Sequence, residues 1–188
     1  MSKRRVLCRA CSLGYCVSPR EHHDSLPFQH RQQPIDVMNH QQVSEICFEE
    51  IYVVPTNQTA RSLFTRLPHG KAYAETLIEC FATGYLIAVV ESICIREMQR
   101  HIDPTAEVVV GRDIRIEHCG PIPSGTKVRL SGWVERLGNR STTFCVRAHD
   151  DHELVCMGQV TLVAADRASI ESRIATKVKC LRKMGSED

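Results

Sequence analysis

The sequence predicts an α+β domain in which a five-stranded antiparallel sheet wraps around one long helix. The helix is indicated by an apolar run over residues 81–95, which only Thr83, Gly84, Glu91 and Ser92 interrupt. The sheet is indicated by five runs of β-branched and aromatic residues, one before the helix and four after it. A helix that is apolar on most sides is typical of one enclosed by other structure, and a sheet with one buried face needs such a cover.

The segments before the central helix are defined by their turn and capping residues. Residues 46–54 form a β-branched and aromatic run that a proline ends, which predicts the first strand. Residues 56–59 (Thr-Asn-Gln-Thr) offer capping side chains for a short helix. An irregular stretch over 72–79 then leads into the central helix over 80–101, which Pro104 closes.

Four strand signals follow in quick succession, over residues 107–119, 126–137, 141–149 and 154–164. A Gly-Asn-Arg hairpin sequence separates the second from the third. Within the third, apolar residues alternate with polar ones, as in half-buried antiparallel strands. The short connections therefore predict antiparallel neighbours.

A final amphipathic segment carries Ile170, Ile174, Val178 and Leu181 at spacings of four, four and three. This spacing predicts a terminal helix with a basic outer face. A highly curved sheet around one long helix is the hot-dog fold, and that is the fold class we predict. Units of this kind commonly pair into dimers, whose shared surface covers what one helix cannot.

Composition and charge exclude several classes of function. The chain has 188 residues, of which 43% are apolar, and a formal net charge of +2. It therefore fits one domain with an appendage, and gives no basis for binding nucleic acid or a membrane surface. No charge-free apolar stretch reaches the ~18 residues of a membrane span. Most of the ten cysteines lie singly within apolar segments, which is typical of buried thiols in a reducing compartment, so we expect a cytoplasmic protein.

The domain is expected to cover residues 43–182, with an extension over 1–42 and a tail over 183–188. Prolines, histidines and glutamines interrupt any period in the extension, which predicts disorder. Two alternatives remain open there. One is an organelle transit peptide, because the first twenty residues are basic, with no acid. The other is a zinc site, because Cys-x-x-Cys begins many such sites. Its candidate ligands are Cys8, Cys11, Cys16, His22 and His23.

Thr83, Glu91 and His118 are the candidate site residues. An ionised Glu91 within the apolar helix costs several kcal/mol unless it is paired or functional. Thr83 lies eight residues earlier, so the two differ by roughly 80° in facing and can border one cleft. A carboxylate and an imidazole in a partly dry pocket can share a proton and activate water or a hydroxyl. Each residue also has a purely structural alternative. Thr83 would cap the helix, and His118 would be a core histidine whose hydrogen bonds are satisfied. Glu91 would form an ion pair with Arg112 or Arg115.

Strand parity decides which residues of the 107–119 strand face the helix. It assigns the inward face to His118 together with Val108, Val110, Ile114 and Ile116.

Three motifs carry a resemblance to a known family. They are Phe-Ala-Thr-Gly at 81–84, Val-Val-Glu-Ser-Ile-Cys at 89–94 and Gly-Arg-Asp-Ile-Arg-Ile-Glu-His at 111–118. In sequence and spacing they resemble the fluoroacetyl-CoA thioesterase type of hot-dog protein. The similarity runs from about residue 46 to residue 179, and does not reach the extension.

The resemblance implies a thioesterase that hydrolyses a short or medium acyl-CoA to free acid and CoA. It implies a homodimer or a dimer of dimers, no metal, and no cofactor beyond the CoA of the substrate. Thr83, Glu91 and His118 are then the catalytic residues. Glu91 would be the nucleophile or activate water, His118 would be general base and acid, and Thr83 would position or attack the thioester.

The resemblance also implies a set of substrate-binding residues: Ala74, Leu77, Phe81, Gly84 and Gly111. Gly84, at the helix N-terminus, can offer a backbone N–H to the developing oxyanion. Gly111 corresponds to a glycine of the acyl pocket, and since parity turns it outward, it needs a bulge to face inward. Ala74 and Leu77 stand where the fluoroacetyl enzyme has lid phenylalanines, so we expect a different, bulkier acyl group.

Two other functions remain open. One is a non-catalytic acyl-CoA-binding hot-dog module, which needs an effector domain, although residues 1–42 are too rich in proline for a helix-turn-helix. The other is an enoyl-CoA hydratase-like enzyme, which pairs an aspartate with a nearby histidine. Asp113 and His118 have that spacing, but parity puts them on opposite faces.

Overall fold

The computed structural model describes residues 40–184, with side chains described over 42–182. Several expectations therefore lie outside the described residues: the disorder of the extension up to residue 39, its transit-peptide alternative and most of the tail. The proposed zinc ligands also lie outside them: Cys8, Cys11, Cys16, His22 and His23.

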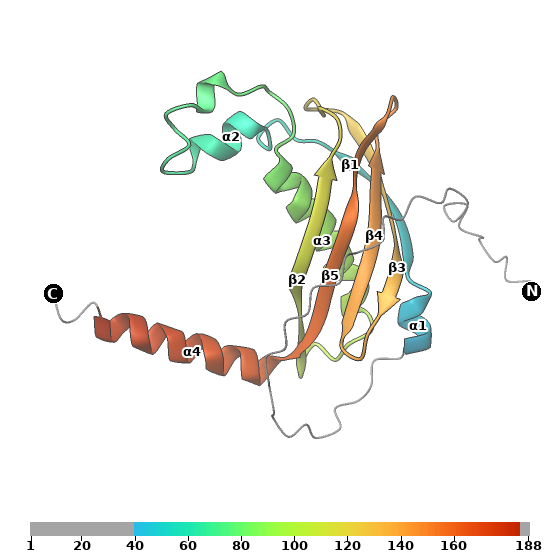
Figure 1. Ribbon diagram of the computed structural model, residues 1–188, viewed down its shortest axis with the longest axis vertical. Helices are drawn as coiled ribbons and strands as arrows, with labels where there is room; N and C mark the ends of the chain where they lie inside the picture. Colours follow the sequence, from blue (N-terminus) through green and yellow to red (C-terminus); the bar gives the residue numbers. More distant parts are fainter. Residues whose placement is uncertain (1–39, 185–188) are drawn as a thin grey trace, which may run out of the picture. The chain divides into compact units, whose positions relative to one another are not determined.

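Five strands form one antiparallel sheet in the order β1-β3-β4-β5-β2, so β1 and β2 are its edges (Figure 1). Each strand ends within two residues of the predicted bounds, and the predicted α+β arrangement is confirmed. The strands are β1 (Cys47–Val53), β2 (Glu107–His118), β3 (Lys127–Leu137), β4 (Ser141–His149) and β5 (Leu154–Asp166).

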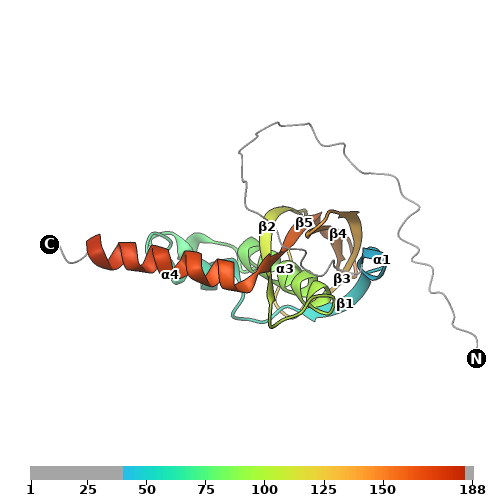
Figure 2. The ribbon, with the colours of Figure 1, turned by 90° about the horizontal axis from the view of Figure 1, so that it is seen from below.

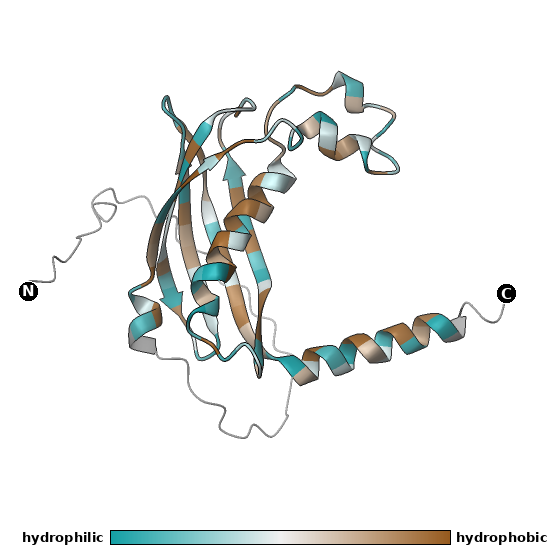
Figure 3. Cartoon of the chain, turned by 180° about the vertical axis from the view of Figure 1, so that it is seen from behind, coloured by the Kyte–Doolittle hydropathy of each residue, from teal (hydrophilic) through white to brown (hydrophobic). Residues whose placement is uncertain are grey.

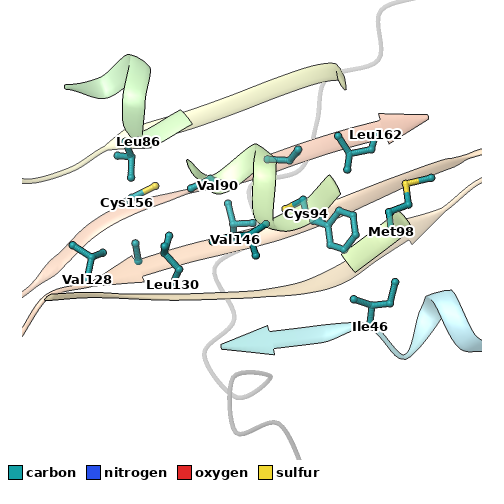
Figure 4. Close-up of a cluster of buried hydrophobic side chains, with 14 of the residues drawn as sticks. Ile46, Leu86, Val90, Cys94, Met98, Val128, Leu130, Val146, Cys156 and Leu162 are labelled. Carbon is teal, nitrogen blue, oxygen red and sulfur yellow. The ribbon is translucent and has the colours of Figure 1, made fainter. Parts of the chain in front are cut away.

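Helix α3 (Thr83–Gln99) lies along the concave face of the sheet, which curves around it (Figure 2). Leu86, Val90, Cys94 and Met98 recur every four residues and are all buried, so they form one seam along the helix. Fully burying one such side chain contributes roughly 1.5–3 kcal/mol. Figure 4 shows this seam against residues of β3, β4 and β5, namely Val128, Leu130, Val146, Cys156 and Leu162.

The remaining helices lie outside this sandwich of helix and sheet. Helix α1 (His40–Ser44) was not predicted, because residues 40–42 were assigned to the extension. Helix α2 (Ala60–Thr65) begins after Thr59, whose side chain accepts a hydrogen bond from the N–H of Ser62 at 3.2 Å, as the capping pattern predicts. A 3₁₀ helix, η2 (Ala74–Thr76), follows, and α4 (Arg167–Met184) continues directly from β5. We call residues 60–80, which contain α2 and η2, the 60–80 segment.

The acid that α3 buries is Glu97 rather than Glu91. Glu97 is 7% exposed, whereas Glu91 is half-buried. The Glu97 carboxylate binds Arg96 at 3.0 Å and Arg100, and Arg96 also binds Glu50 of β1 at 2.6 Å. The prediction took Glu91 as the buried acid because it interrupts the apolar run, and Glu97 lies beyond the end of that run.

A β-bulge in β2 changes which side chains face α3. The pairing with β5 shifts between Gly111 and Asp113, so one extra residue reverses the parity towards the start of the strand. Val109 is therefore the buried residue there, and the prediction that Val108 and Val110 face inward is wrong. The bulge that an inward-facing Gly111 requires is present.

One face of α3 is turned away from the sheet, and much of it is apolar (Figure 3). Ile87 and Ile95 are half-buried there, and Ala88 is exposed. The sequence predicts a helix covered on nearly every side, but no other part of residues 40–184 buries this face.

The described residues include no helix long and apolar enough to cross a membrane. All seven described cysteines are free thiols. Burial raises the pKa of both Cys94 and Cys156 to about 12.

Two glycines test how tightly the sheet is built. A Cβ at Gly158 would overlap the backbone of β2 at Arg115, whereas a Cβ at Gly132 would overlap only the ring of Phe48. Because a side chain can move and a paired strand cannot, we expect Gly158→Ala to lose more stability than Gly132→Ala. The expected loss for Gly158→Ala is about 1–3 kcal/mol. Denaturant unfolding measures both, and equal losses would contradict this account of the packing.

Candidate active site

Thr83 and His118 meet where α3 begins and β2 ends. The Oγ1 atom of Thr83 and the Nδ1 atom of His118 are 2.9 Å apart, a hydrogen bond in which either atom can donate. Thr83 does not cap its helix, because the N-cap residue is Ala82, which has no side chain able to cap it. The threonine hydroxyl is therefore directed at the imidazole, and the capping alternative is excluded.

The imidazole of His118 is partly buried and incompletely hydrogen-bonded. Its Nε2 atom is buried, with no hydrogen-bond partner among the described residues. Burial lowers the pKa of His118, against a smaller raising effect of the nearby backbone of Gly120. His118 is therefore largely neutral at pH 7, and one ring nitrogen is able to accept a proton.

The first turn of α3 leaves its backbone donors open. Among the described residues, the amides of Thr83, Gly84 and Tyr85 have no recorded acceptor, whereas the amide of Leu86 already binds the carbonyl of Ala82. Thr83 and Gly84 are exposed. Open N–H groups at a helix N-terminus favour negative charge, so an anion forming beside Thr83 would be stabilised.

A cavity of about 310 Å³ opens at this point and is lined by Thr83, His118, Cys119, Gly120 and Pro121. The last three come from the loop after β2, and sequence reasoning did not select them for the site. Their signal was available, because a turn directly after a candidate catalytic histidine is bound to lie beside it.

Glu91 lies against Gly111 rather than against the histidine. A Cβ at position 111 would overlap the Oε1 atom of Glu91, so the glycine makes room for the carboxylate. The described residues form no ion pair with Glu91, and Arg115 instead binds Asp113 at 3.1 Å. The ion-pair alternative for Glu91 therefore has no support in this part of the chain.

The three candidate catalytic residues thus form two groups along the junction of α3 and β2. Thr83 and Glu91 are eight residues apart, or about 12 Å along the helix axis. Thr83 contacts His118 at one end, and Glu91 contacts Gly111 further along. The cavity beside Thr83 and His118 does not have Glu91 among its lining residues. We call the junction of α3 and β2 between the two groups the groove.

The remaining predicted substrate-binding residues lie around the start of α3. Phe81 is buried and stacks on Tyr52 with ring centroids 5.8 Å apart, so it belongs to the core rather than to the lining of the cavity. Ala74 is also buried, and Leu77 is half-buried. Gly84 faces α2: a Cβ there would lie 3.0 Å from a methyl group of Leu63, a neighbour that sequence reasoning missed.

The alternative pairing of Asp113 with His118 is not formed. Asp113 pairs with Thr161 on the outward side of the bulge, whereas His118 pairs with Cys156, which is buried. Among the described residues, no group of His, Cys, Asp and Glu side chains could hold a metal ion.

Comparison with models of known protein families shows which family this chain belongs to. The model of the fluoroacetyl-CoA-specific thioesterases matches residues 69–168, which is more than half of the chain. The chain belongs to this family. A curated relative, the fluoroacetyl-CoA thioesterase of Streptantibioticus cattleyicolor, is 31% identical over 103 residues, covering 55% of this chain and 70% of the relative.

Solved structures agree on the fold. A structure of the fluoroacetyl-CoA thioesterase superposes with a TM-score of 0.64 at 24% identity, covering 71% of this chain and 95% of that chain. A thioesterase superfamily member from Thermus thermophilus gives 0.61 at 17% identity, covering 77% and 96%. A hot-dog-like protein from Thermanaerovibrio acidaminovorans gives 0.61 at 15% identity, covering 74% and 97%. The predicted hot-dog fold is confirmed.

We expect the imidazole of His118 to titrate below 6.5, the value for an unperturbed histidine, because burial disfavours its charged form. The stability that the neutral ring contributes is then fully present above pH 6.5 and is lost as the pH falls from there toward the lower folded pKa. An NMR titration of the ring protons measures the midpoint, with His118→Gln to assign the signal. A midpoint at or above 6.5 would contradict the described burial.

Proposed function

We propose that this protein is an acyl-CoA thioesterase that converts a short or medium acyl-CoA to the free acid and CoA at the Thr83, Glu91 and His118 groove. The observation that carries the proposal is the hydrogen bond between Thr83 and His118. It lies in a cavity beside a helix N-terminus with open amides, and membership of the thioesterase family supports it.

The proposed chemistry begins with neutral His118 acting as a general base. As the hydroxyl oxygen of Thr83 attacks the thioester carbonyl, its proton passes to Nδ1 of His118. The oxyanion forms beside the open amides of the first turn of α3. The carbon–sulfur bond then breaks, and the imidazolium returns the proton to the CoA thiolate.

Water completes the reaction by hydrolysing the acyl ester on Thr83, with Glu91 as the base. In the alternative route, Glu91 activates water or attacks directly, and Thr83 only orients the thioester carbonyl. Both routes give the same products from one thioester and one water molecule. Both routes use Glu91, and in both His118 gives a proton to the CoA thiolate, so the test below applies to either.

We also infer that the working unit is a homodimer joined through β2 and the free face of α3. β2 is an edge strand of 12 residues, and such an edge is a template for another strand. Pairing with a second copy about a two-fold axis would cover both the edge and the apolar face that includes Ile87 and Ile95.

The acyl group is expected to differ from fluoroacetyl. Solved structures of the fluoroacetyl enzyme include complexes with fluoroacetate and with acetyl-CoA. In this chain, Ala74 is buried and Leu77 is half-buried, and neither residue is aromatic. We therefore propose a bulkier short or medium acyl chain as the preferred substrate.

The function is tested by thiol release across a panel of acyl-CoA esters. We expect wild-type activity on short or medium chains, and a loss of about 10²–10⁴-fold for Glu91→Ala and for His118→Ala. Glu49→Ala and His149→Ala, at exposed positions of the outer sheet face, should keep wild-type rates. Binding of acyl-CoA without any release of thiol would favour the non-catalytic module instead.

Gly111→Ala tests the place of Glu91 without removing its carboxylate. The added methyl group would overlap Oε1 of Glu91, so we expect a loss of kcat of about tenfold or more, through misplacement of a reacting group. Gly138→Ala is the matched control, because its methyl group would also overlap the end of a side chain, that of Ser141, in a distant hairpin. Equal kcat values for both variants would contradict a role for Glu91 in the reaction.

A further inference from the structure

The inward face of β2 carries two isoleucines between the candidate catalytic groups. Ile114 and Ile116 alternate with exposed residues along the strand, and both pack against the buried core. In the register with β5, Ile114 lies opposite Val160, which is fully buried. His118 likewise lies opposite the fully buried Cys156. Directly paired residues share one face of a sheet, so both isoleucines and His118 face the side on which α3 lies.

Ile116 has a glycine as its neighbour on β5. Gly158 lies directly opposite Ile116 and has no side chain to cover it. Ile116 is half-buried, whereas Val146 and Leu162 on the inner strands are at most 1% exposed. Part of the apolar surface of Ile116 is therefore left open, only two residues from His118.

Ile114 lies beside the other candidate catalytic group, Glu91. A Cβ at Gly111 would overlap Oε1 of Glu91 and would lie 4.0 Å from Cδ1 of Ile114. The space above Gly111 is thus bordered by the carboxylate on one side and by a methyl group on the other. An acyl group that approaches Glu91 along β2 meets Ile114 as well.

The spacing of these side chains along the strand matches the spacing along the helix. Thr83 and Glu91 are about 12 Å apart along the axis of α3, and α3 packs against β2. His118 and Ile114 are four residues apart, which is about 13 Å along a strand. Helix and strand are in contact at both ends of this length, so Ile116 stands level with the middle of the groove.

We propose that Ile114 and Ile116 form the wall against which the acyl chain lies, and that Ile116 limits the length of that chain. This inference rests on the proposed hydrolysis of an acyl-CoA and deepens it, because it names side chains that select the acyl group. With the thioester carbonyl at Thr83 and His118, the chain extends along β2 past Ile116 toward Ile114. Both side chains of the wall are aliphatic, so the preferred substrate carries an aliphatic acyl group without polar substituents.

The other edge strand of the sheet shows that an edge position does not by itself require an aliphatic side chain. Glu50 of β1 is half-buried on the inward side of its strand, and it binds Arg96 of α3 at 2.6 Å. A charged residue is thus accepted at the junction of α3 with β1. The aliphatic pair on β2 fits an apolar ligand in addition to the core.

Activity on two chain lengths tests the role of Ile116. Ile116→Ala removes most of the side chain, so we expect kcat/KM for octanoyl-CoA relative to butyryl-CoA to rise about tenfold. Ile116→Phe should shift the same ratio in the opposite direction. Both substrates are measured by thiol release on one preparation, so any unfolded fraction of a variant cancels from the ratio.

Ile102→Ala is the matched control for this measurement. Ile102 is half-buried and packs against the same core, but it follows the end of α3 that is remote from Thr83. We expect the ratio to stay at its wild-type value. A shift as large as that of Ile116→Ala would overturn the inference, as would wild-type ratios in both Ile116 variants.

A polar substituent tests the aliphatic character of the wall. A hydroxyl group at the end of the acyl chain would lie against isoleucine and lose its hydrogen bonds to water. We therefore expect kcat/KM for 6-hydroxyhexanoyl-CoA to be about tenfold below that for hexanoyl-CoA. Equal values for the two esters would contradict the proposed wall.

Binding of S-alkyl-CoA thioethers separates this inference from the proposed hydrolysis. These analogues carry an alkyl chain but no thioester carbonyl, so they bind without reacting. Calorimetry should show that Ile116→Ala favours S-octyl-CoA over S-butyl-CoA about tenfold more than the wild type does. A wild-type chain that releases no thiol contradicts the enzymatic proposal, while a shift in this binding ratio still supports the wall. An active enzyme whose two ratios do not respond to Ile116 contradicts the wall alone.

Discussion

The packing of α3 against the concave face of the sheet is the interaction on which both the fold and the groove depend. Leu86, Val90, Cys94 and Met98 fix the rotation of the helix, because all four must face the sheet at once. That rotation directs the first turn of the helix at the end of β2, where Thr83 meets His118. The hydrogen bond of the site is thus a consequence of core packing, and no loop has to position either residue.

The rotation of α3 also places the candidate catalytic groups, His118 and Glu91, at the boundary between the buried core and the solvent-exposed surface. Burial is enough to lower the pKa of His118, yet the cavity beside it remains open. Glu91 lies further along this boundary, where only a glycine in β2 leaves room for its carboxylate. A site of this kind needs a helix that is covered on one side and free on the other, which is what one protomer provides.

The sequence was sufficient for the five strands and for α2, α3 and α4, but not for α1. The catalytic roles of Thr83, Glu91 and His118 stay predictions. Alternation and turn residues predicted all five strands, because half-buried strands leave a two-residue period. The bulge at Gly111 left no such signal, since one extra residue changes parity only for the side chains that precede it, and so Val108 and Val110 were misassigned. The buried Glu97 was missed because Arg96 and Arg100 of the same helix offset the free-energy cost of burying its charge. In a sequence, neighbouring acidic and basic residues of this kind look like the solvent-exposed face of a helix.

What one chain leaves uncovered follows from the same geometry. A single helix can bury only the face that the sheet encloses, so the apolar side chains on the free face of α3, on the 60–80 segment and on α4 all need cover from elsewhere. The free face of α3 lies beside the β2 edge, so the proposed two-fold pairing on that edge would cover this face. In the proposed dimer, the folding unit is one chain, while two chains together cover the apolar face of α3.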